Sequence, residues 1–304
     1  MFEQGGDIIK HISVIGKGPI SNALVHAIQL QKDMKFVTSS SHEKIDAYFY
    51  VTEESLLIPE HISTQGIPIV TIGGTKKDLS FFLLTRKESD ISTSDVINIP
   101  NVQNISLLRI LFSISNIISM HVTSIEPTDG SEKRGPIDAL VPLDPSWLSQ
   151  LETHFNIDFS GQSVLAQHTR SFLLGINIRL NTPTSKEEIV KLLTNADRIL
   201  MTPSGLNMNN TALVSEFFRD IGRPVGAFYE TVIIGESLKV EAEKVSFWMV
   251  SHKLSILLES IDSMRLLLEI ENNFNDSRTL TNNTLGVFSK LSPREMGKRV
   301  WDYV

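Results

Sequence analysis

Cysteine is absent from this sequence of 304 residues. That absence excludes disulfides, thiolate metal ligands and any cysteine nucleophile. The histidines are scattered without the i, i+4 spacing that zinc sites on helices use. The sequence therefore predicts no metal site.

Positive charge is in short supply, with 28 Lys and Arg against 35 Asp and Glu and a formal charge of -7. A general affinity for nucleic acid or anionic lipid is not expected. Long apolar runs are also lacking, because the most apolar long segment, residues 107–122, contains Arg109, Asn116 and several serines. The N-terminus shows no basic region followed by an apolar core. We expect a cytoplasmic protein with neither a nucleic-acid nor a membrane partner.

A glycine-rich turn follows the first apolar segment. Residues 11–15 predict a short buried strand, and residues 16–21 predict the turn into a helix. Gly16 and Gly18 match the first two glycines of a dinucleotide turn, which bends tightly and lets a pyrophosphate approach the helix N-terminus. Pro19 lacks an N–H for a phosphate, and Ser21 replaces the third glycine. The turn is open to two interpretations, a cofactor site or an ordinary strand-turn-helix.

Strands and helices alternate over the first hundred residues, which predicts a parallel sheet with covering helices. Thr38 and three serines follow the second strand, where NAD-binding folds usually carry an acidic residue. The limited length between the second and fourth strands predicts fewer strands than a full six-stranded nucleotide domain. The later strands are expected at residues 35–37, 47–51, 68–72 and 96–99.

The second half of the chain predicts an α+β domain with a largely antiparallel sheet. Ser185 and Glu188 form a capping box that begins a helix. Two long strands around a turn at Gly235 predict a hairpin. The expected segments are a helix at 106–118, a loop at 126–136, strands at 172–180, 198–201, 225–234 and 238–250, and helices at 210–220 and 256–270.

Several segments, in order over nearly the whole chain, resemble the archaeal type of glyceraldehyde-3-phosphate dehydrogenase. They are residues 16–20 with 27–34, 73–78, 134–142, 258–265 and 281–286. The resemblance implies a Rossmann-like dinucleotide-binding domain at 1–105, a catalytic-type domain at 106–257, and C-terminal helices at 258–304 that return to the first domain.

The resemblance also implies a site for NAD or NADP. The residues that it assigns to the cofactor are Gly16, Gly18, Pro19, Ile20, Gly74 and His252.

The catalytic machinery of this family has no counterpart here. The family attacks an aldehyde with a cysteine thiolate, and Val102 falls at that position. Of the neighbouring groups that would hold substrate, Asn104 and Ser106 remain. The family's histidine pair and the arginine pair expected before Pro127 also lack counterparts, so no catalytic residue is predicted.

Two functions remain open. The first is a non-catalytic relative with a binding, regulatory or assembly role, as a homo-oligomer or in a mixed oligomer with an active paralogue, in which the cofactor is kept or lost. The alternative is an NAD(P)-dependent oxidoreductase that acts on an aldehyde or alcohol without a covalent intermediate. This alternative needs a proton acceptor, for which His252 and His154 are the candidates.

Overall fold

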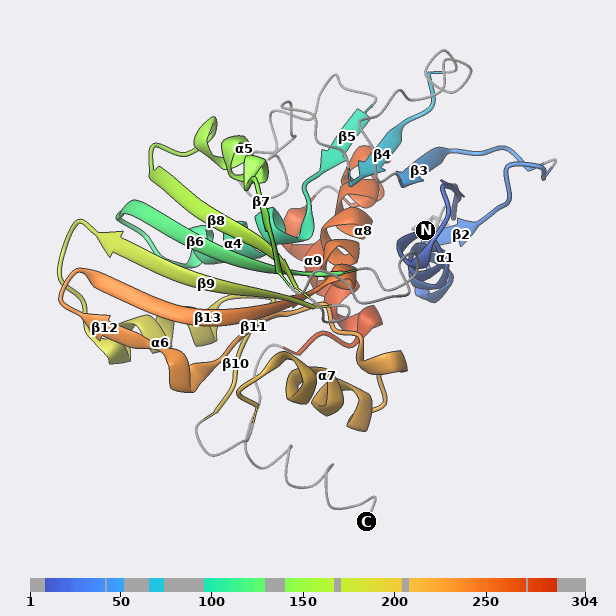
Figure 1. The fold of residues 1–304 in the computed structure, drawn as a ribbon. Helices are drawn as coiled ribbons and strands as arrows, with labels where there is room; N and C mark the ends of the chain where they lie inside the picture. The colour runs from blue at the N-terminus through green and yellow to red at the C-terminus, as the bar shows by residue number, and fades with distance from the viewer. Residues whose placement is uncertain are drawn as a thin grey trace, which may run out of the picture. The chain divides into compact units, whose positions relative to one another are not determined.

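The chain forms two compact units, each with its own sheet (Figure 1). One unit comprises residues 1–101 and 256–286, and the other comprises residues 102–255 and 287–304. The structure is a computed structural model. It describes residues 9–41, 43–51, 66–73, 96–128, 140–166, 171–203, 208–271 and 273–288.

The sheet of the first unit is parallel, with five described strands in the order β2-β1-β3-β4-β5. Its central strands β3 and β4 are almost wholly buried, as is usual where a parallel sheet is enclosed. The expected parallel sheet is confirmed. The strands are β1 (Lys10–Ile15), β2 (Met34–Phe36), β3 (Ala47–Val51), β4 (Ile69–Ile72) and β5 (Val96–Ile99).

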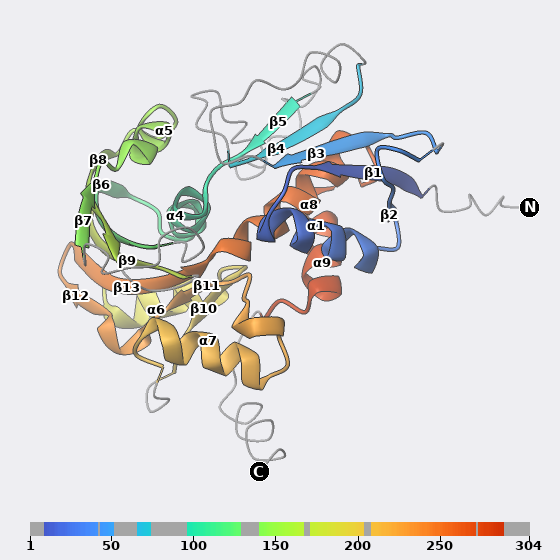
Figure 2. The ribbon, with the colours of Figure 1, turned by 45° about the vertical axis from the view of Figure 1, so that its right-hand side comes forward.

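Three helices, α1 (Pro19–Leu30), α8 (Ile256–Leu267) and α9 (Phe274–Leu285), lie on one face of this sheet (Figure 2). Helix α8 packs against β4 and β5, and α9 packs against α8 and α1. Gly286 ends α9 in the left-handed conformation that favours glycine at this position.

A buried polar network joins these three helices. The guanidinium of Arg265 donates to Asp33 Oδ2 at 2.6 Å, Gln31 Oε1 at 2.5 Å and Thr281 Oγ1 at 2.5 Å. The carboxylate of Asp262 accepts from the hydroxyls of Thr281 and Ser277. Helix α8 thus hydrogen-bonds both to α9 and to the segment between α1 and β2.

The second unit contains an eight-stranded mixed sheet in the order β10-β11-β13-β9-β6-β8-β7, with β12 paired to β13. Among the strands that the structure describes, only β10 with β11 and β6 with β8 pair in parallel, so the expected largely antiparallel sheet is confirmed. The strands are β6 (Ile117–Pro127), β7 (Leu140–Leu143), β8 (Asp158–Ala166), β9 (Ser171–Leu180), β10 (Ile199–Met201), β11 (Thr231–Ile233), β12 (Lys239–Glu241) and β13 (Lys244–His252).

One face of this sheet is covered by α4 (Val102–Ser113) and by the turn η2 (Ser146–Leu148) that leads into α5 (Ser149–Glu152). Helix α6 (Lys186–Asn195) packs against α4 and β10. Ser185 caps α6 as expected, because its Oγ accepts from the Glu188 N–H at 3.1 Å.

Helix α7 (Thr211–Asp220) covers only part of the opposite face. Its Val214 and Phe218 pack with Phe228, Val232 and Val250. The remainder of this face, toward the start of β13, carries exposed polar side chains.

The helix expected at 106–118 is wrong at both ends. Helix α4 starts at Val102 and ends at Ser113, and Ile117 already belongs to β6. Along β6 the buried Met120 and Val122 alternate with His121 and Thr123, a period of two that predicts a strand. The expected loop from residue 126 is also shortened, since β6 runs to Pro127, and residues 129–136 lie outside the described part of the chain.

The two strands expected on either side of Gly235 do pair antiparallel, as β11 with β13, but the tight turn expected at Gly235 is misplaced. Residues Gly235–Ser237 form a short 3₁₀ turn, η4, and the hairpin turn lies between β12 and β13 at Ala242 and Glu243. A Cβ on Gly235 would lie 2.2 Å from Thr202 O, so this glycine serves close packing. Ala242 has a φ of 51°, a conformation that its residue type does not signal in the sequence. Strand β8, with several polar residues, was not expected at all.

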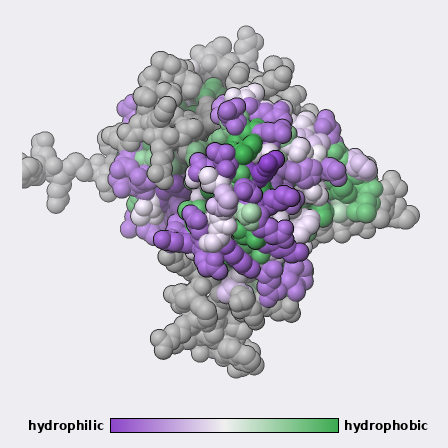
Figure 3. All heavy atoms as spheres, turned by 90° about the vertical axis from the view of Figure 1, so that its left-hand side faces the viewer, coloured by the Kyte–Doolittle hydropathy of each residue, from purple (hydrophilic) through white to green (hydrophobic). Residues whose placement is uncertain are grey.

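The helices of the described residues include none that is both long and apolar enough to cross a membrane. Purple hydrophilic residues predominate among the described residues on the side of the molecule in Figure 3, with green hydrophobic residues in smaller patches between them.

Candidate functional site

The turn between β1 and α1 requires glycine for two different reasons. Both Gly16 and Gly18 have positive φ, at 133° and 108°. A Cβ on Gly16 would lie 2.5 Å from Val51 O, so this glycine allows β1 and β3 to approach. A Cβ on Gly18 would meet no atom of the described residues within 4 Å. Close packing therefore favours glycine at position 16, whereas at position 18 the positive φ alone favours it.

The N-terminus of α1 adds hydrogen-bond donors to this turn. Pro19 at the first helical position has no N–H, and the Asn22 N–H is used by Gly18 O. The N–H groups of Ile20 and Ser21 are those that the start of a helix leaves without an intrahelical acceptor. The Ser21 Oγ is buried and has no hydrogen-bond partner among the described residues. The two N–H groups are therefore the donors that the start of α1 leaves over, whereas the Ser21 hydroxyl is closed off from the surface.

The segment after β2 is polar and exposed. Thr38, Ser39 and Ser40 stand where an acidic residue would hold the ribose of NAD. The hydroxyls of Thr38 and Ser40 lie 3.4 Å apart. The donors at this position are hydroxyls rather than a carboxylate. Gly74 lies outside the described residues.

Helix α4 contains the residues expected near a substrate, but their side chains are buried within the second unit. Val102 begins the helix and is 6% exposed. The Asn104 amide donates to Trp147 O at 3.0 Å and to Gln150 Oε1 at 2.6 Å. Both Asn104 and Ser106 are fully buried.

Ser106 is similarly engaged. Its Oγ donates to Val102 O at 2.9 Å and lies 2.6 Å from the hydroxyl of Ser251 on β13. The polar groups of α4 therefore hold η2, α5 and β13 against this helix.

Arg109, one turn further along α4, has a structural role that the sequence did not reveal. Its guanidinium donates to Tyr229 O at 2.8 Å, Thr231 Oγ1 at 3.3 Å and Ser255 O at 3.1 Å. In the sequence, the one signal for such a role is an arginine within an otherwise apolar helical segment, because a buried arginine needs hydrogen-bond partners. Burial raises the pKa of the nearby Tyr229 hydroxyl above its usual 10.0, while Arg223 opposes that shift.

His252, the last residue of β13, is buried. Its Nδ1 accepts from the Leu254 N–H at 3.1 Å, and its ring packs on Phe228 with centroids 5.2 Å apart. With Nδ1 as an acceptor, the neutral ring carries its proton on Nε2. In this arrangement His252 can donate a proton from Nε2 but has no nitrogen left to accept one.

His154, the other candidate, lies on the surface after α5. Its Nδ1 is 3.1 Å from Gln150 O and 2.6 Å from Thr153 Oγ1. The structure places His154 and His252 in the second unit, whereas Gly16, Gly18, Pro19 and Ile20 belong to the first. Across the described residues, no group of three or more His, Asp and Glu side chains is placed to hold a metal ion.

Comparison with known proteins identifies relatives over most of the chain. A glyceraldehyde-3-phosphate dehydrogenase of Metallosphaera sedula is 26% identical over 91% of this chain and 97% of its own length. One of Saccharolobus solfataricus is 26% identical over 91% of this chain and 98% of its own length. The chain is similar to glyceraldehyde-3-phosphate dehydrogenases. No protein-family model matches it.

A solved structure matches the fold. The aspartate semialdehyde dehydrogenase II of Vibrio cholerae superposes with a TM-score of 0.61 over 86% of this chain and 98% of its own, at 9% identity. At that identity the likeness concerns the fold. Together these similarities support a dehydrogenase-like scaffold of the glyceraldehyde-3-phosphate dehydrogenase kind.

Proposed function

We propose that this chain is a glyceraldehyde-3-phosphate dehydrogenase-like protein that does not perform cysteine-dependent aldehyde oxidation and instead has a binding, regulatory or assembly role. The observation that carries the proposal is the absence of cysteine from the whole sequence. A thiohemiacetal needs a thiolate, and Val102 has no lone pair with which to attack a carbonyl carbon.

The burial of the neighbouring polar groups supports the same proposal. Asn104 and Ser106 are hydrogen-bonded to Gln150 and Ser251 within the second unit. A serine or asparagine that already satisfies a buried partner cannot reach a substrate without leaving that partner unpaired, which costs free energy. We therefore propose that these two residues stabilise the second unit instead of binding a substrate, in addition to the loss of the nucleophile.

An assay of hydride transfer tests the proposal. The purified protein is mixed with glyceraldehyde-3-phosphate and either NAD⁺ or NADP⁺, and the absorbance of reduced cofactor is followed. We expect the rate to equal that of the reaction without protein. The Metallosphaera sedula enzyme, under the same conditions, is the positive control. A rate that rises in proportion to the concentration of this protein contradicts the proposal.

The second candidate function is an NAD(P)-dependent oxidoreductase that uses no covalent intermediate. The glycine turn favours it, because the start of α1 leaves the N–H groups of Ile20 and Ser21 as donors for a phosphate. Pro19, Gly74 and His252 complete the cofactor residues that this candidate assigns. The His252 hydrogen bond weighs against it, since Nδ1 already accepts from Leu254.

The same assay separates the two candidates when it includes simple aldehydes and alcohols. Cofactor binding without any hydride transfer supports the non-catalytic proposal, and hydride transfer supports the oxidoreductase. A transfer rate that survives in the His252→Ala, His154→Ala double variant excludes both histidines as the proton acceptor.

We also propose that the protein assembles into a homo-oligomer or into a mixed oligomer with an active paralogue. Light scattering on the protein alone, and after mixing with an active relative, measures the mass of each species. A single species with the mass of one chain, with or without the relative, contradicts this assembly.

A further inference from the structure

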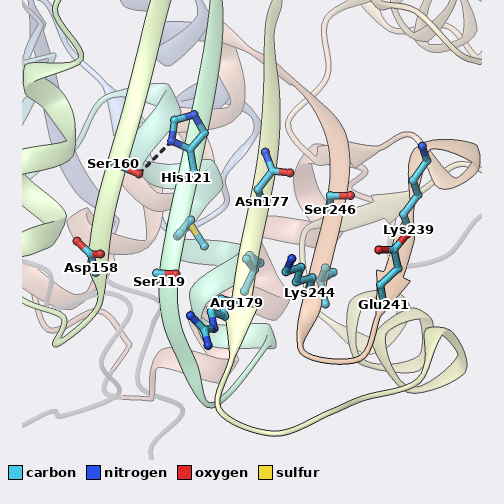
Figure 4. Close-up of a pocket in the computed structure, with 13 residues that line it drawn as sticks. Ser119, His121, Asp158, Ser160, Asn177, Arg179, Lys239, Glu241, Lys244 and Ser246 are labelled. Atoms are coloured by element: carbon cyan, nitrogen blue, oxygen red, sulfur yellow. Dashed lines mark hydrogen bonds between the residues drawn. The ribbon is translucent and has the colours of Figure 1, made fainter.

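A buried ion pair closes the segment between α7 and β11. Arg223 donates to both carboxylate oxygens of Glu230, from Nη1 to Oε2 at 2.9 Å and from Nη2 to Oε1 at 2.7 Å. The two side chains are 11% and 0% exposed. By contrast, Glu241 and Lys244, which stand directly opposite each other at the polar hollow of Figure 4, are exposed. A buried pair with two parallel hydrogen bonds holds both ends of the intervening segment in a fixed geometry.

Phe228 lies inside the segment that this ion pair closes, and it is fully buried. Its ring stacks on Phe218 of α7, with centroids 4.8 Å apart and 16° between the ring planes. The ring of His252 packs on the same Phe228 ring, with centroids 5.2 Å apart. His252 therefore rests on a ring whose segment is held at one end by Arg223 and at the other by Glu230.

The chain that follows α9 contributes to the same arrangement. The N–H groups of Phe288 and Tyr229 donate to the two oxygens of Glu230, at 2.7 Å and 3.0 Å. The guanidinium of Arg223 lies over the rings of Phe218, Tyr229 and Phe288, with Cζ 5.0, 4.8 and 5.3 Å from their centroids. A cation over the face of an aromatic ring is attracted to it. Phe288 belongs to the second unit, so these contacts all lie within that unit.

We propose that Arg223, Glu230 and Phe288 form a clasp that positions the ring of His252 by holding Phe228 in place. The three residues of the clasp are positioning residues, because they act on His252 through another side chain. One of the three follows the last described helix, so the orientation of His252 depends on a segment near the end of the described chain. The clasp acts whether or not a cofactor binds, and in this respect it goes beyond the proposed function.

The physical reason is the cost of an unpaired buried charge. A fully buried carboxylate that loses its guanidinium partner is strongly destabilised until it reaches water. Glu230 can reach water only if its segment moves, and Phe228 stands two residues before it. The support beneath His252 is then lost.

NMR of protein labelled with ¹³C-histidine tests the clasp. The ring signals of His252 are identified by their absence in His252→Gln. We expect Glu230→Gln to shift these signals, because the Phe228 ring that shields His252 moves. Phe288→Leu should shift them in the same direction but by less, since it removes one of the three rings around Arg223 and keeps the N–H.

Two control variants match these changes. Glu216→Gln removes an exposed ion pair with Arg219 on α7. Phe274→Leu removes the ring beneath Arg278 in the first unit. Both controls should leave the ring signals of His252 at their wild-type positions.

A double variant separates positioning from a general loss of stability. Because Arg223 and Glu230 act as a pair, the Arg223→Gln, Glu230→Gln variant should shift the His252 signals no further than the larger of the two single variants. Hydrogen exchange of the amides in β6 and β9 measures the stability of the second sheet in the same samples. A purely structural role would accelerate that exchange and leave the folded-state signals of His252 unchanged.

Two results would overturn the clasp. The first is unchanged His252 ring signals in Glu230→Gln and Phe288→Leu, and Phe288→Leu alone decides where Glu230→Gln does not fold. The second is an equal shift in Glu216→Gln, which would indicate a general effect of charge on α7. The measurement uses the protein without cofactor or substrate, so failure of the clasp leaves the proposed function untouched.

Discussion

Replacing Gly16 by alanine will lower the free energy of unfolding by about 3 kcal/mol or more, the sum of a left-handed backbone and an overpacked contact. The φ of Gly16 is 133°, and its new Cβ would lie 2.5 Å from Val51 O and 2.9 Å from Val51 Cβ. Both obstacles are backbone or branched side-chain atoms of β3, which cannot move without disturbing the centre of the parallel sheet.

Gly18→Ala is the matched control. The φ of Gly18 is 108°, but its added Cβ would meet nothing within 4 Å among the described residues. We expect a loss of roughly 1–2 kcal/mol, from backbone strain alone. Urea denaturation followed by circular dichroism measures both variants, and equal losses would show that the Val51 contact does not matter.

The comparison also separates folding from function in this turn. Gly16 is required for the packing of β1 against β3, whether or not a cofactor binds. Its presence alone is therefore no evidence for NAD or NADP. Gly18 is the position whose substitution should affect a ligand more than the fold.

Replacing Arg265 by methionine will cost about 3–5 kcal/mol, the usual penalty for leaving one partner of a buried ion pair behind. The Arg265 side chain is 2% exposed and donates to Asp33, Gln31 and Thr281. Methionine fills much of the volume, so the loss measures the unpaired polar groups rather than a cavity. Arg265→Lys should recover only part of the stability, because an ammonium group lacks the planar fork.

Arg219→Met, on the exposed side of α7, is the control and should change stability by no more than about 0.5 kcal/mol. Native-state hydrogen exchange locates the effect. We expect faster exchange in α1, α8 and α9 of Arg265→Met, with the amides of the second sheet less affected. Uniform acceleration over both units would contradict a network confined to the first unit.

The first unit could be predicted well from the sequence because its signals are local. The strands of the parallel sheet are short apolar segments, and β3 and β4 are buried on both faces. Helix α1 follows a glycine turn and begins with Pro19, which suits the first turn of a helix. Neighbouring residues contain the information for these elements.

The second sheet was harder to predict because its strands depend on partners distant in the sequence. Strand β8 contains polar residues and pairs in parallel with β6. The turn at Ala242 uses a conformation that alanine does not signal. A strand of this kind is stabilised by the sheet on both sides of it, and a single sequence does not reveal which segments will be its neighbours.

For the candidate site, the sequence by itself determined which chemistry is available. A chain without cysteine has no thiolate, whatever its fold. The sequence likewise determined that Gly16 and Gly18 could form a tight turn, and that hydroxyls rather than a carboxylate follow β2.

Only the tertiary structure decided which of these groups can act. It placed Asn104 and Ser106 inside the second unit, engaged with internal partners, and gave His252 Nδ1 a backbone donor. It also brought the Phe288 N–H to the Glu230 carboxylate, although the two residues lie 58 positions apart in the chain. The type of a residue determines the chemistry of its side chain. Burial and strand register determine which groups that side chain contacts, and burial and register depend on contacts between distant parts of the chain.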